Sequence, residues 1–157
     1  MIVVVQRVEH AQVAVEGKIV GQAGKGCLLL IGVASGDTYE DADVIIKKIP
    51  LLRIFTDSED KMNLSLTDIG GEVLAISNFT LLGNCRRGNR PDYMGAEKPD
   101  EALNLYQYFV EKLRKTVNHV ATGVFGADMR IESIADGPVT IILDSKALRA
   151  PRSGGAS

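Results

Sequence analysis

The chain has 157 residues, and its 18 Lys and Arg against 20 Asp and Glu give a formal net charge of −2. This length fits one domain, and 45% apolar with 24% charged residues is typical of a globular protein that folds without disulfide or metal cross-links. The balanced charge argues against a protein that coats a nucleic-acid duplex with a broad basic face. Two histidines are too few for a histidine-rich metal site, so we expect neither a metal nor another cofactor.

The sequence patterns of membrane and secreted proteins are not found here. No apolar run approaches the roughly 20 residues of a membrane-spanning helix. Residues 1–7 lack the basic start, long apolar centre and small-residue cleavage site of a signal peptide. The two cysteines, Cys27 and Cys85, are not spaced as metal ligands, which is typical of a reducing compartment. We therefore expect a cytoplasmic protein that does not associate with membranes.

The first third of the chain is predicted to form strands. Residues 2–8 are an apolar run rich in β-branched side chains, and apolar and polar residues alternate over residues 12–16. Gly17-Lys18 then predicts a hairpin turn into residues 19–20. Residues 27–33 form an apolar run that is short enough for a buried strand.

A first helix is predicted to begin after Asp37 or Thr38, because Asp41 stands three residues beyond Thr38 in the spacing of a capping box. Proline disfavours a helical residue before it, so Pro50 should end this helix. Residues 52–55 then favour a short strand. The helix would bury one apolar stripe, formed by Ala42, Ile45, Ile46 and Ile49.

The second half is predicted to contain a strand, a second helix and further strands. Residues 72–77 favour a strand, and a polar, glycine-containing stretch over residues 83–99 leads to a helix that begins near Pro99. The buried stripe of that helix would be Ala102, Leu105, Tyr106, Phe109 and Leu113. Three closing strands are predicted, over residues 119–125, 129–134 and 139–143.

Together these elements predict an α+β fold with a mainly antiparallel, barrel-like β-sheet and two principal helices. A single domain would cover residues 1–145. Residues 146–157 are small and polar, which predicts a flexible C-terminal tail.

The densest basic stretch contains Arg86, Arg87 and Arg90 within an otherwise slightly acidic chain. One interpretation is a solvated loop, which is the usual setting of a charge run. The other is a contact for RNA phosphates, because arginine forks match phosphate oxygens and the intervening Gly88 allows close approach. The sequence leaves both interpretations open, and a phosphate contact here would involve one local patch only.

Neither cysteine is a strong candidate for a nucleophile. Cys27 lies in an apolar run, as expected of a small buried side chain. The neighbouring Arg86 and Arg87 could lower the pKa of Cys85, but no histidine close in sequence could act as its base. An incidental thiol is therefore the favoured interpretation of Cys85.

Two short segments carry more information together than either does alone. Ser77-Asn78-Phe79-Thr80-Leu81 ends a predicted strand, and Gly137-Pro138-Val139-Thr140 opens the last one. Taken singly, hydroxyl side chains at a strand end often satisfy backbone groups, and Gly-Pro is a common turn dipeptide. Together, in this order, they resemble the Ser-Gln-x-Thr-Leu and Gly-Pro-Val-Thr motifs of the D-aminoacyl-tRNA deacylase family.

The resemblance to this family extends over about residues 1–145. Two departures accompany it: Asn78 stands where glutamine is usual, and Ala135 where many members have asparagine. Asn78 lies within the first motif and Ala135 just before the second, so both bear on substrate preference more than on the reaction. The supporting segments are 5–8, 52–55, 61–65 and 125–129.

The resemblance implies a hydrolase that cleaves the ester bond of D-aminoacyl-tRNA while it rejects L-aminoacyl-tRNA, with mischarged glycyl-tRNA as a further candidate substrate. An aminoacyl ester is already activated, so a placed carbonyl, oxyanion donors and an admitted water suffice. Backbone N–H groups around Phe79 and Thr80, with the Ser77 hydroxyl, are the expected donors, assisted by the 2′-hydroxyl of the tRNA. Thr80 is the obvious nucleophile, but no visible base activates it, which favours positioning over covalent catalysis.

The resemblance also implies how chirality is selected. The family uses its Gly-Pro pair in cis and donates it across a homodimer interface into the partner's pocket, so Gly137 and Pro138 would exclude an L side chain. Arg7 resembles the arginine that helps to hold this loop. Met129 lies in the matching motif beside it, and a plain core position is an equally good interpretation of this methionine.

Two other functions remain compatible with the sequence. The departures at Asn78 and Ala135 could have disabled turnover and left a non-catalytic module that binds the tRNA acceptor end. Alternatively, the preference could have shifted towards glycine on a mismatched tRNA.

Overall fold

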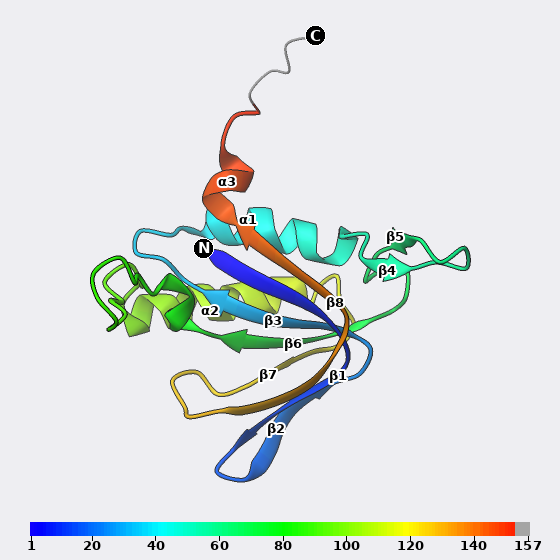
Figure 1. Ribbon diagram of the computed structural model, residues 1–157, viewed down its shortest axis with the longest axis horizontal. Helices are drawn as coiled ribbons and strands as arrows, with labels where there is room; N and C mark the ends of the chain where they lie inside the picture. The colour runs from blue at the N-terminus through cyan, green and yellow to red at the C-terminus, as the bar shows by residue number, and fades with distance from the viewer. Residues whose placement is uncertain (153–157) are drawn as a thin grey trace.

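Six strands form one strongly curved, nearly barrel-shaped sheet in the computed structural model, which describes residues 1–152 (Figure 1). The strand order is β2-β1-β3-β6-β7, and β8 pairs with the other side of β1. A Cβ on Gly21 in β2 would lie 2.3 Å from the carbonyl oxygen of Thr122 in β7, so the two ends of the sheet approach closely. The strands are β1 (Ile2–Val15), β2 (Lys18–Ala23), β3 (Gly26–Gly32), β6 (Glu72–Ser77), β7 (Val120–Thr122) and β8 (Arg130–Asp144).

The sheet is mixed. β1 pairs antiparallel with β2, β3 and β8, whereas β3 pairs parallel with β6, and β6 pairs parallel with β7. The prediction of an α+β fold with a mainly antiparallel sheet is thus confirmed, and the two parallel pairings are an addition that it did not contain. Their consequence is geometric, because the carboxyl ends of β3, β6 and β7 lie at the same edge of the sheet.

The longest strands are longer than predicted. The separate runs 2–8 and 12–16 belong to one strand, β1, whose first half pairs with β3 and whose second half pairs with β2. The two closing strands expected at 129–134 and 139–143 are likewise one strand, β8. Residues 52–55 are not a strand as predicted, because a 3-10 turn (Ile49–Leu51) precedes them and β4 (Phe55–Thr56) pairs only briefly with β5 (Met62–Leu64).

Two helices cover one face of the sheet, α1 (Tyr39–Lys48) and α2 (Pro99–Leu113) (Figure 1). Thr38 caps α1, and its backbone N–H donates to the Asp41 carboxylate at 2.9 Å, as the capping-box spacing predicted. The main core lies between these helices and the sheet, with fully buried side chains such as Ile45 and Phe109. A smaller apolar cluster fills the curve of the sheet: Val8, Ala11, Val13, Ala23, Leu28, Leu74 and Ile76.

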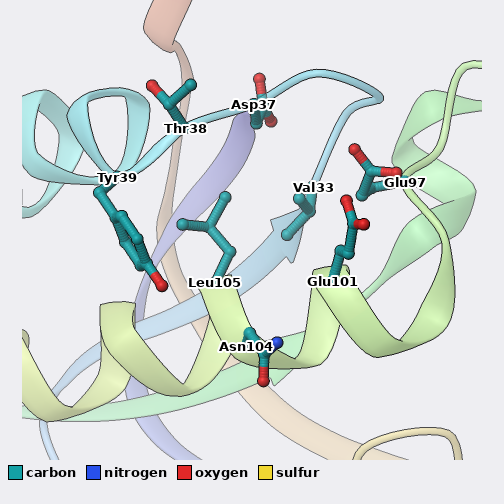
Figure 2. Close-up of a pocket in the computed structure, with 8 residues that line it drawn as sticks. All are labelled: Val33, Asp37, Thr38, Tyr39, Glu97, Glu101, Asn104 and Leu105. Atoms are coloured by element: carbon teal, nitrogen blue, oxygen red, sulfur yellow. The ribbon is translucent and has the colours of Figure 1, made fainter.

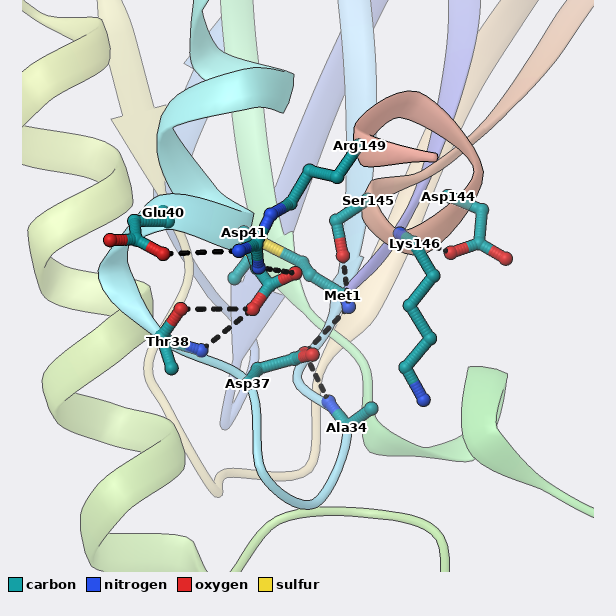
Figure 3. Close-up of polar contacts among 10 residues, drawn as sticks. All are labelled: Met1, Ala34, Asp37, Thr38, Glu40, Asp41, Asp144, Ser145, Lys146 and Arg149. Carbon is teal, nitrogen blue, oxygen red and sulfur yellow. Dashed lines mark hydrogen bonds and ion pairs between the residues drawn. The ribbon is translucent and has the colours of Figure 1, made fainter. Parts of the chain in front are cut away.

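The C-terminal segment contains a short helix, α3 (Ser145–Arg149), within the stretch that the sequence predicted to be a flexible tail. Arg149 forms ion pairs of 3.0 Å with both Glu40 and Asp41 of α1 (Figure 3). The α-amino group of Met1 is buried and donates to the hydroxyl of Ser145, the first residue of α3, at 2.8 Å. Residues 153–157 of the predicted tail lie outside the described residues.

Within residues 1–152, no helix combines the length and apolar character needed to cross a membrane. The same part of the chain holds no group of three or more His, Cys, Asp or Glu side chains placed to bind a metal ion.

Candidate active site

A cavity of about 560 Å³ opens at the edge where the parallel strands β3, β6 and β7 end. The carboxyl ends of parallel strands are a recurrent place for ligands, because the chain leaves the sheet there in loops that surround a common space. Here the loops after the three strands meet the first turn of α2. The polar and aromatic lining residues include Ser77, Asn78, Phe79, Tyr93, Glu97, Lys98 and Phe125, and Met129 lines the cavity with them.

The motif that begins with Ser77 forms one wall of this cavity. Ser77 is the last residue of β6, and the Asn78 N–H donates to the Ile31 carbonyl at 2.8 Å, which fixes where the chain leaves the sheet. A single 3-10 turn (Phe79–Leu82) follows. The hydroxyl of Thr80 donates to the Asn78 side-chain carbonyl at 2.5 Å. Thr80 follows Phe79 but is not itself among the residues that line the cavity in the described part of the chain, and neither histidine is. The Thr80 hydroxyl thus has an amide neighbour and no imidazole base in this wall.

Aromatic side chains make the cavity walls apolar. Phe79 is 57% exposed, and its ring meets Tyr93 edge-on with the ring centres 5.3 Å apart. Phe125 packs against Tyr106, whose hydroxyl donates to the Ala75 carbonyl of β6 at 2.8 Å. Burial raises the pKa of Tyr106 to about 12, so this phenol stays protonated and acts as a structural donor.

Met129 both lines the cavity and packs against the cluster inside the curved sheet. A Cβ on Gly123 would lie 2.4 Å from the Met129 sulfur, so this methionine depends on the glycine opposite it. The two interpretations offered by the sequence, a pocket residue and a core residue, therefore both describe its position.

A second, smaller hollow of about 320 Å³ adjoins the cavity and shares Val33 and Glu97 with it (Figure 2). Glu97 accepts from the backbone N–H of Gly36 and from that of Lys98, both at 2.9 Å. These two hydrogen bonds, the Gly36 bond foremost, hold the pKa of Glu97 below its usual value. The carboxylate is therefore ionised at neutral pH, and it adds negative charge to the rim of both hollows.

Gly137 and Pro138 lie away from this cavity within one chain. Gln6 pairs with Thr140 and Val8 with Ala135, so the ladder between β1 and β8 is interrupted by a bulge, residues 136–139, opposite Arg7. The Gly137–Pro138 peptide bond in this bulge is cis, and both residues are exposed. Gly137 has φ +127°, a conformation that favours glycine.

Arg7 lies opposite the bulge and stabilises it through hydrogen bonds and an ion pair. Its side chain is 8% exposed, and Nε lies 3.1 Å from the Asp136 carbonyl and 3.2 Å from the Asp136 carboxylate. Nη1 donates to the Ile54 carbonyl at 2.6 Å. The structure thus brings Arg7 together with Gly137 and Pro138, and it groups Ser77 and Phe79 with Met129 around the separate cavity.

The arginine loop, residues 84–92, lies beyond the cavity rim. Asn84 and Asp92 pair through both backbone hydrogen bonds, at 2.8 and 2.9 Å, which closes the loop into a hairpin. Arg86, Arg87 and Arg90 are exposed, and the first two line a hollow of about 490 Å³. The prediction of a local basic patch is therefore compatible with this geometry.

The two cysteines differ as the sequence predicted. Cys27 is 1% exposed, and burial raises the pKa of its thiol to about 12, so it is an inert core residue. Cys85 is an exposed thiol of the arginine loop.

Among the cavity residues that were not predicted from the sequence are three with polar side chains, namely Tyr93, Glu97 and Lys98. They belong to a polar loop and to the cap of α2, and no motif marks them. The available signal was their position just before a predicted helix start, where side chains often face a neighbouring sheet edge.

Sequence comparisons identify relatives of this chain along nearly its whole length. The family profile described as D-Tyr-tRNA(Tyr) deacylase matches residues 4–144. A D-aminoacyl-tRNA deacylase of Persephonella marina is 55% identical over 148 residues, which cover 94% of this chain and 100% of that protein. One of Caldicellulosiruptor bescii is 54% identical over 143 residues, which cover 91% of this chain and 96% of that protein.

Two solved structures share the fold. The protein named c-Myc DNA Unwinding Element Binding Protein superposes with a TM-score of 0.87 at 38% identity, covering 92% of this chain and 98% of that one. A probable eukaryotic D-amino acid tRNA deacylase superposes with a TM-score of 0.80 at 20% identity, covering 91% and 98%, which supports the fold alone. The resemblance carried by the two motifs is confirmed by the profile and the relatives, and the chain belongs to the D-Tyr-tRNA(Tyr) deacylase family.

Proposed function

We propose that this protein hydrolyses the ester bond of D-aminoacyl-tRNA and spares L-aminoacyl-tRNA, as a chiral proofreading esterase. The observation that carries the proposal is the cavity at the ends of β3, β6 and β7, where Ser77 and Phe79 meet Met129. Its volume of about 560 Å³ suits an aminoacyl group and its ribose, and its lining is apolar with a few polar groups.

The ester carbonyl would be activated mainly by main-chain groups. Phe79 and Thr80 begin the 3-10 turn, so their N–H groups have no partner within that turn. Directed at the ester oxygen, these donors and the Ser77 hydroxyl would stabilise the negative charge that develops on it. Water then attacks the carbonyl carbon, the bond to the ribose oxygen breaks, and the tRNA 2′-hydroxyl assists departure of that oxygen.

Thr80 acts here as a positioning residue. Its hydroxyl proton is directed at the Asn78 carbonyl, at 2.5 Å, and no histidine is present to remove it. A threonine hydroxyl is a weak nucleophile without a base. The pair Thr80–Asn78 therefore shapes the turn that presents the N–H groups.

Chiral selection would come from Gly137 and Pro138 of a second copy of the chain. In one chain these residues are exposed and lie outside the cavity, while Arg7 is hydrogen-bonded to Asp136, which precedes them. The same strand carries Ile134 and Ile142, which are 61% and 70% exposed. An exposed apolar strand beside a braced loop supports a homodimer in which each loop enters the partner's cavity.

The remaining partner is the tRNA itself. Arg86, Arg87 and Arg90 would contact phosphates near the acceptor end, which requires a local basic patch and no strongly basic chain. Such a substrate places the protein in the cytoplasm, where aminoacyl-tRNA is made and used. Asn78 and Ala135 stand near the motifs and would adjust substrate preference, for example towards glycyl-tRNA.

Release of tyrosine from D-tyrosyl-tRNA, with L-tyrosyl-tRNA as the control and glycyl-tRNA as a third substrate, tests the proposal. We expect rapid release from the D-substrate and none above background from the L-substrate. Binding of D-tyrosyl-tRNA without release would instead identify a non-catalytic module, and preferential release of glycine would identify the shifted relative.

A further inference from the structure

The chain has a second basic surface that the proposed reaction does not use. A groove of about 810 Å³ runs between the C-terminal half of α1 and the segment that includes α3. We define the basic groove by its four cations, Lys47, Lys48, Arg53 and Arg152, and no acidic side chain is among its lining residues in the described part of the chain. In a chain of net charge −2, such a concentration of one sign indicates an anionic partner.

The end of helix α1 does not by itself account for this charge. Lys47 and Lys48 belong to the last turn of α1, where cations interact favourably with the helix dipole. Arg53, however, follows a 3-10 turn, and Arg152 follows α3, so three separate segments bring their cations to one groove. Convergence from separate segments is the arrangement expected of a binding surface.

Within residues 1–152, none of the four cations forms an ion pair with a carboxylate. Other cations of the same part of the chain, namely Lys112, Arg149 and Arg7, do form such pairs. Arg53 is held through its Nε, which donates to the Asn63 carbonyl at 3.0 Å, and through a contact with the Asn63 side chain. Lys47 contributes to the electrostatic environment of Asp43, and Arg53 to that of Asp68, but neither carboxylate lines the groove. All four cations are exposed and available to a ligand.

We infer that the basic groove binds the phosphodiester backbone of the tRNA body, away from the ester that is cleaved. The inference rests on the proposed function, because that function supplies an RNA partner. An extended polyanion matches a groove with several unpaired cations, and binding would release counterions and therefore weaken as salt increases. Leu51 on the groove wall is 66% exposed. An exposed apolar side chain among the cations suits a ligand that offers ribose as well as phosphate better than it suits a free anion.

The test compares two substrates that share the ester and differ in their phosphates. These are D-tyrosyl-tRNA and 3′-O-D-tyrosyl-adenosine, and the variant is the double substitution Lys47→Gln and Lys48→Gln, which retains helix-forming side chains. We expect KM for the tRNA substrate to rise about three- to tenfold, with kcat and the adenosine ester unaffected. The slope of log KM against log salt should fall by about one to two, because each lost phosphate contact removes about 0.7–0.9.

The matched control is the double substitution Lys18→Gln and Lys115→Gln, which removes two exposed lysines far from the groove residues in sequence and outside its lining. The control should leave KM and the salt slope unchanged. An unchanged KM in the groove variant, or an equal loss on both substrates, would overturn the inference. So would binding of the wild type to vesicles of anionic phospholipid that is lost in the variant while tRNA binding persists.

Binding of uncharged tRNA, measured by filter retention, separates this inference from the proposed reaction. If the wild type cleaves neither ester, the proposed function fails, yet a loss of tRNA binding in the groove variant would still support the groove. If the wild type cleaves both esters and the groove variant binds tRNA normally, only the inference about the groove fails.

Discussion

The cavity around Ser77 and the bulge around Arg7 are built in opposite ways. At the cavity wall, Phe79 and the neighbouring Thr80 are exposed, and the N–H groups of these two residues have no partner within their turn. At the bulge, a nearly buried arginine ties Asp136 and Ile54 together through hydrogen bonds of 2.6–3.1 Å. In the proposed reaction, hydrolysis therefore depends on backbone that is open to a substrate, whereas chiral selection depends on backbone that is held rigid. This difference predicts that mutations in the two regions will have different signatures.

The largest effect is expected from Arg7→Ala. The substitution removes a buried hydrogen-bonded charge and leaves the Ile54 carbonyl without its donor, so the free energy of unfolding should fall by about 2–4 kcal/mol. The bulge would lose its brace, and discrimination against L-tyrosyl-tRNA should weaken with it. Chemical denaturation and the two-substrate assay measure these effects, and Arg7→Lys, which keeps the charge without the fork, should lie between. Full stability together with full discrimination in the alanine variant would show that the brace is dispensable.

Pro138→Ala should affect selection with little loss of stability. Release from L-tyrosyl-tRNA is expected to rise at least about tenfold, which corresponds to about 1.4 kcal/mol in the barrier, while the rate on the D-substrate is largely retained. Pro91→Ala, at another exposed proline, is the control and should leave selectivity unchanged. Complete protection of the L-substrate in Pro138→Ala would contradict the assigned role.

Asp41→Asn is expected to change the free energy of unfolding without changing the activity. Burial would raise the pKa of Asp41, but hydrogen bonds from the Thr38 backbone, Ser145 and Arg149 hold it well below its usual range. A depressed pKa stabilises the folded state above about pH 4, the pKa of an unfolded aspartate, and this stabilisation is lost as the pH falls. The variant should lose about 1 kcal/mol at pH 7, show a shallower decline in acid, and retain its kcat. A parallel acid profile for the two proteins would argue against this linkage.

The smallest effect is expected from Thr80→Ala. The hydroxyl contacts Asn78 and has no base, so single-turnover hydrolysis of D-tyrosyl-tRNA should fall less than about tenfold. Asn78→Gln, which restores the side chain usual in the family, is a useful companion and should alter substrate preference more than rate. Complete inactivity of a folded Thr80→Ala protein would mean that the hydroxyl itself attacks the ester.

Local patterns predicted the elements well. Residues 72–77 and the helix beginning at Pro99 lie where the sequence placed them, because each has a clear period and a clear break. The parallel pairing of β3, β6 and β7 was not predicted, since it depends on contacts between distant residues that no local pattern records. The merging of two runs into β1 was missed for the same reason, because β1 changes its pairing partner along its length.

The site was predictable only in part. The motifs identified Ser77 and Phe79 on one side and Arg7 with Gly137 on the other, and the first pair lines the cavity. Tyr93 and Glu97 were missed because a loop residue faces a cavity only through the tertiary fold, as the edge-on contact between Tyr93 and Phe79 illustrates.

The bulge opposite Arg7 has a consequence for protein engineering. Regular pairs flank it, from Ile2–Asp144 to Gln6–Thr140 on one side and, after a second irregularity between Val8 and His10, from His10–Ile134 to Ala14–Arg130 on the other. These long paired stretches hold the two strands together on either side of the bulge. An inserted or deleted residue within 136–139 would therefore change how far the loop projects without sliding β8 along β1. Loop length is thus a design variable, and under the proposed role of the loop a series of such variants would tune which acyl groups the protein accepts.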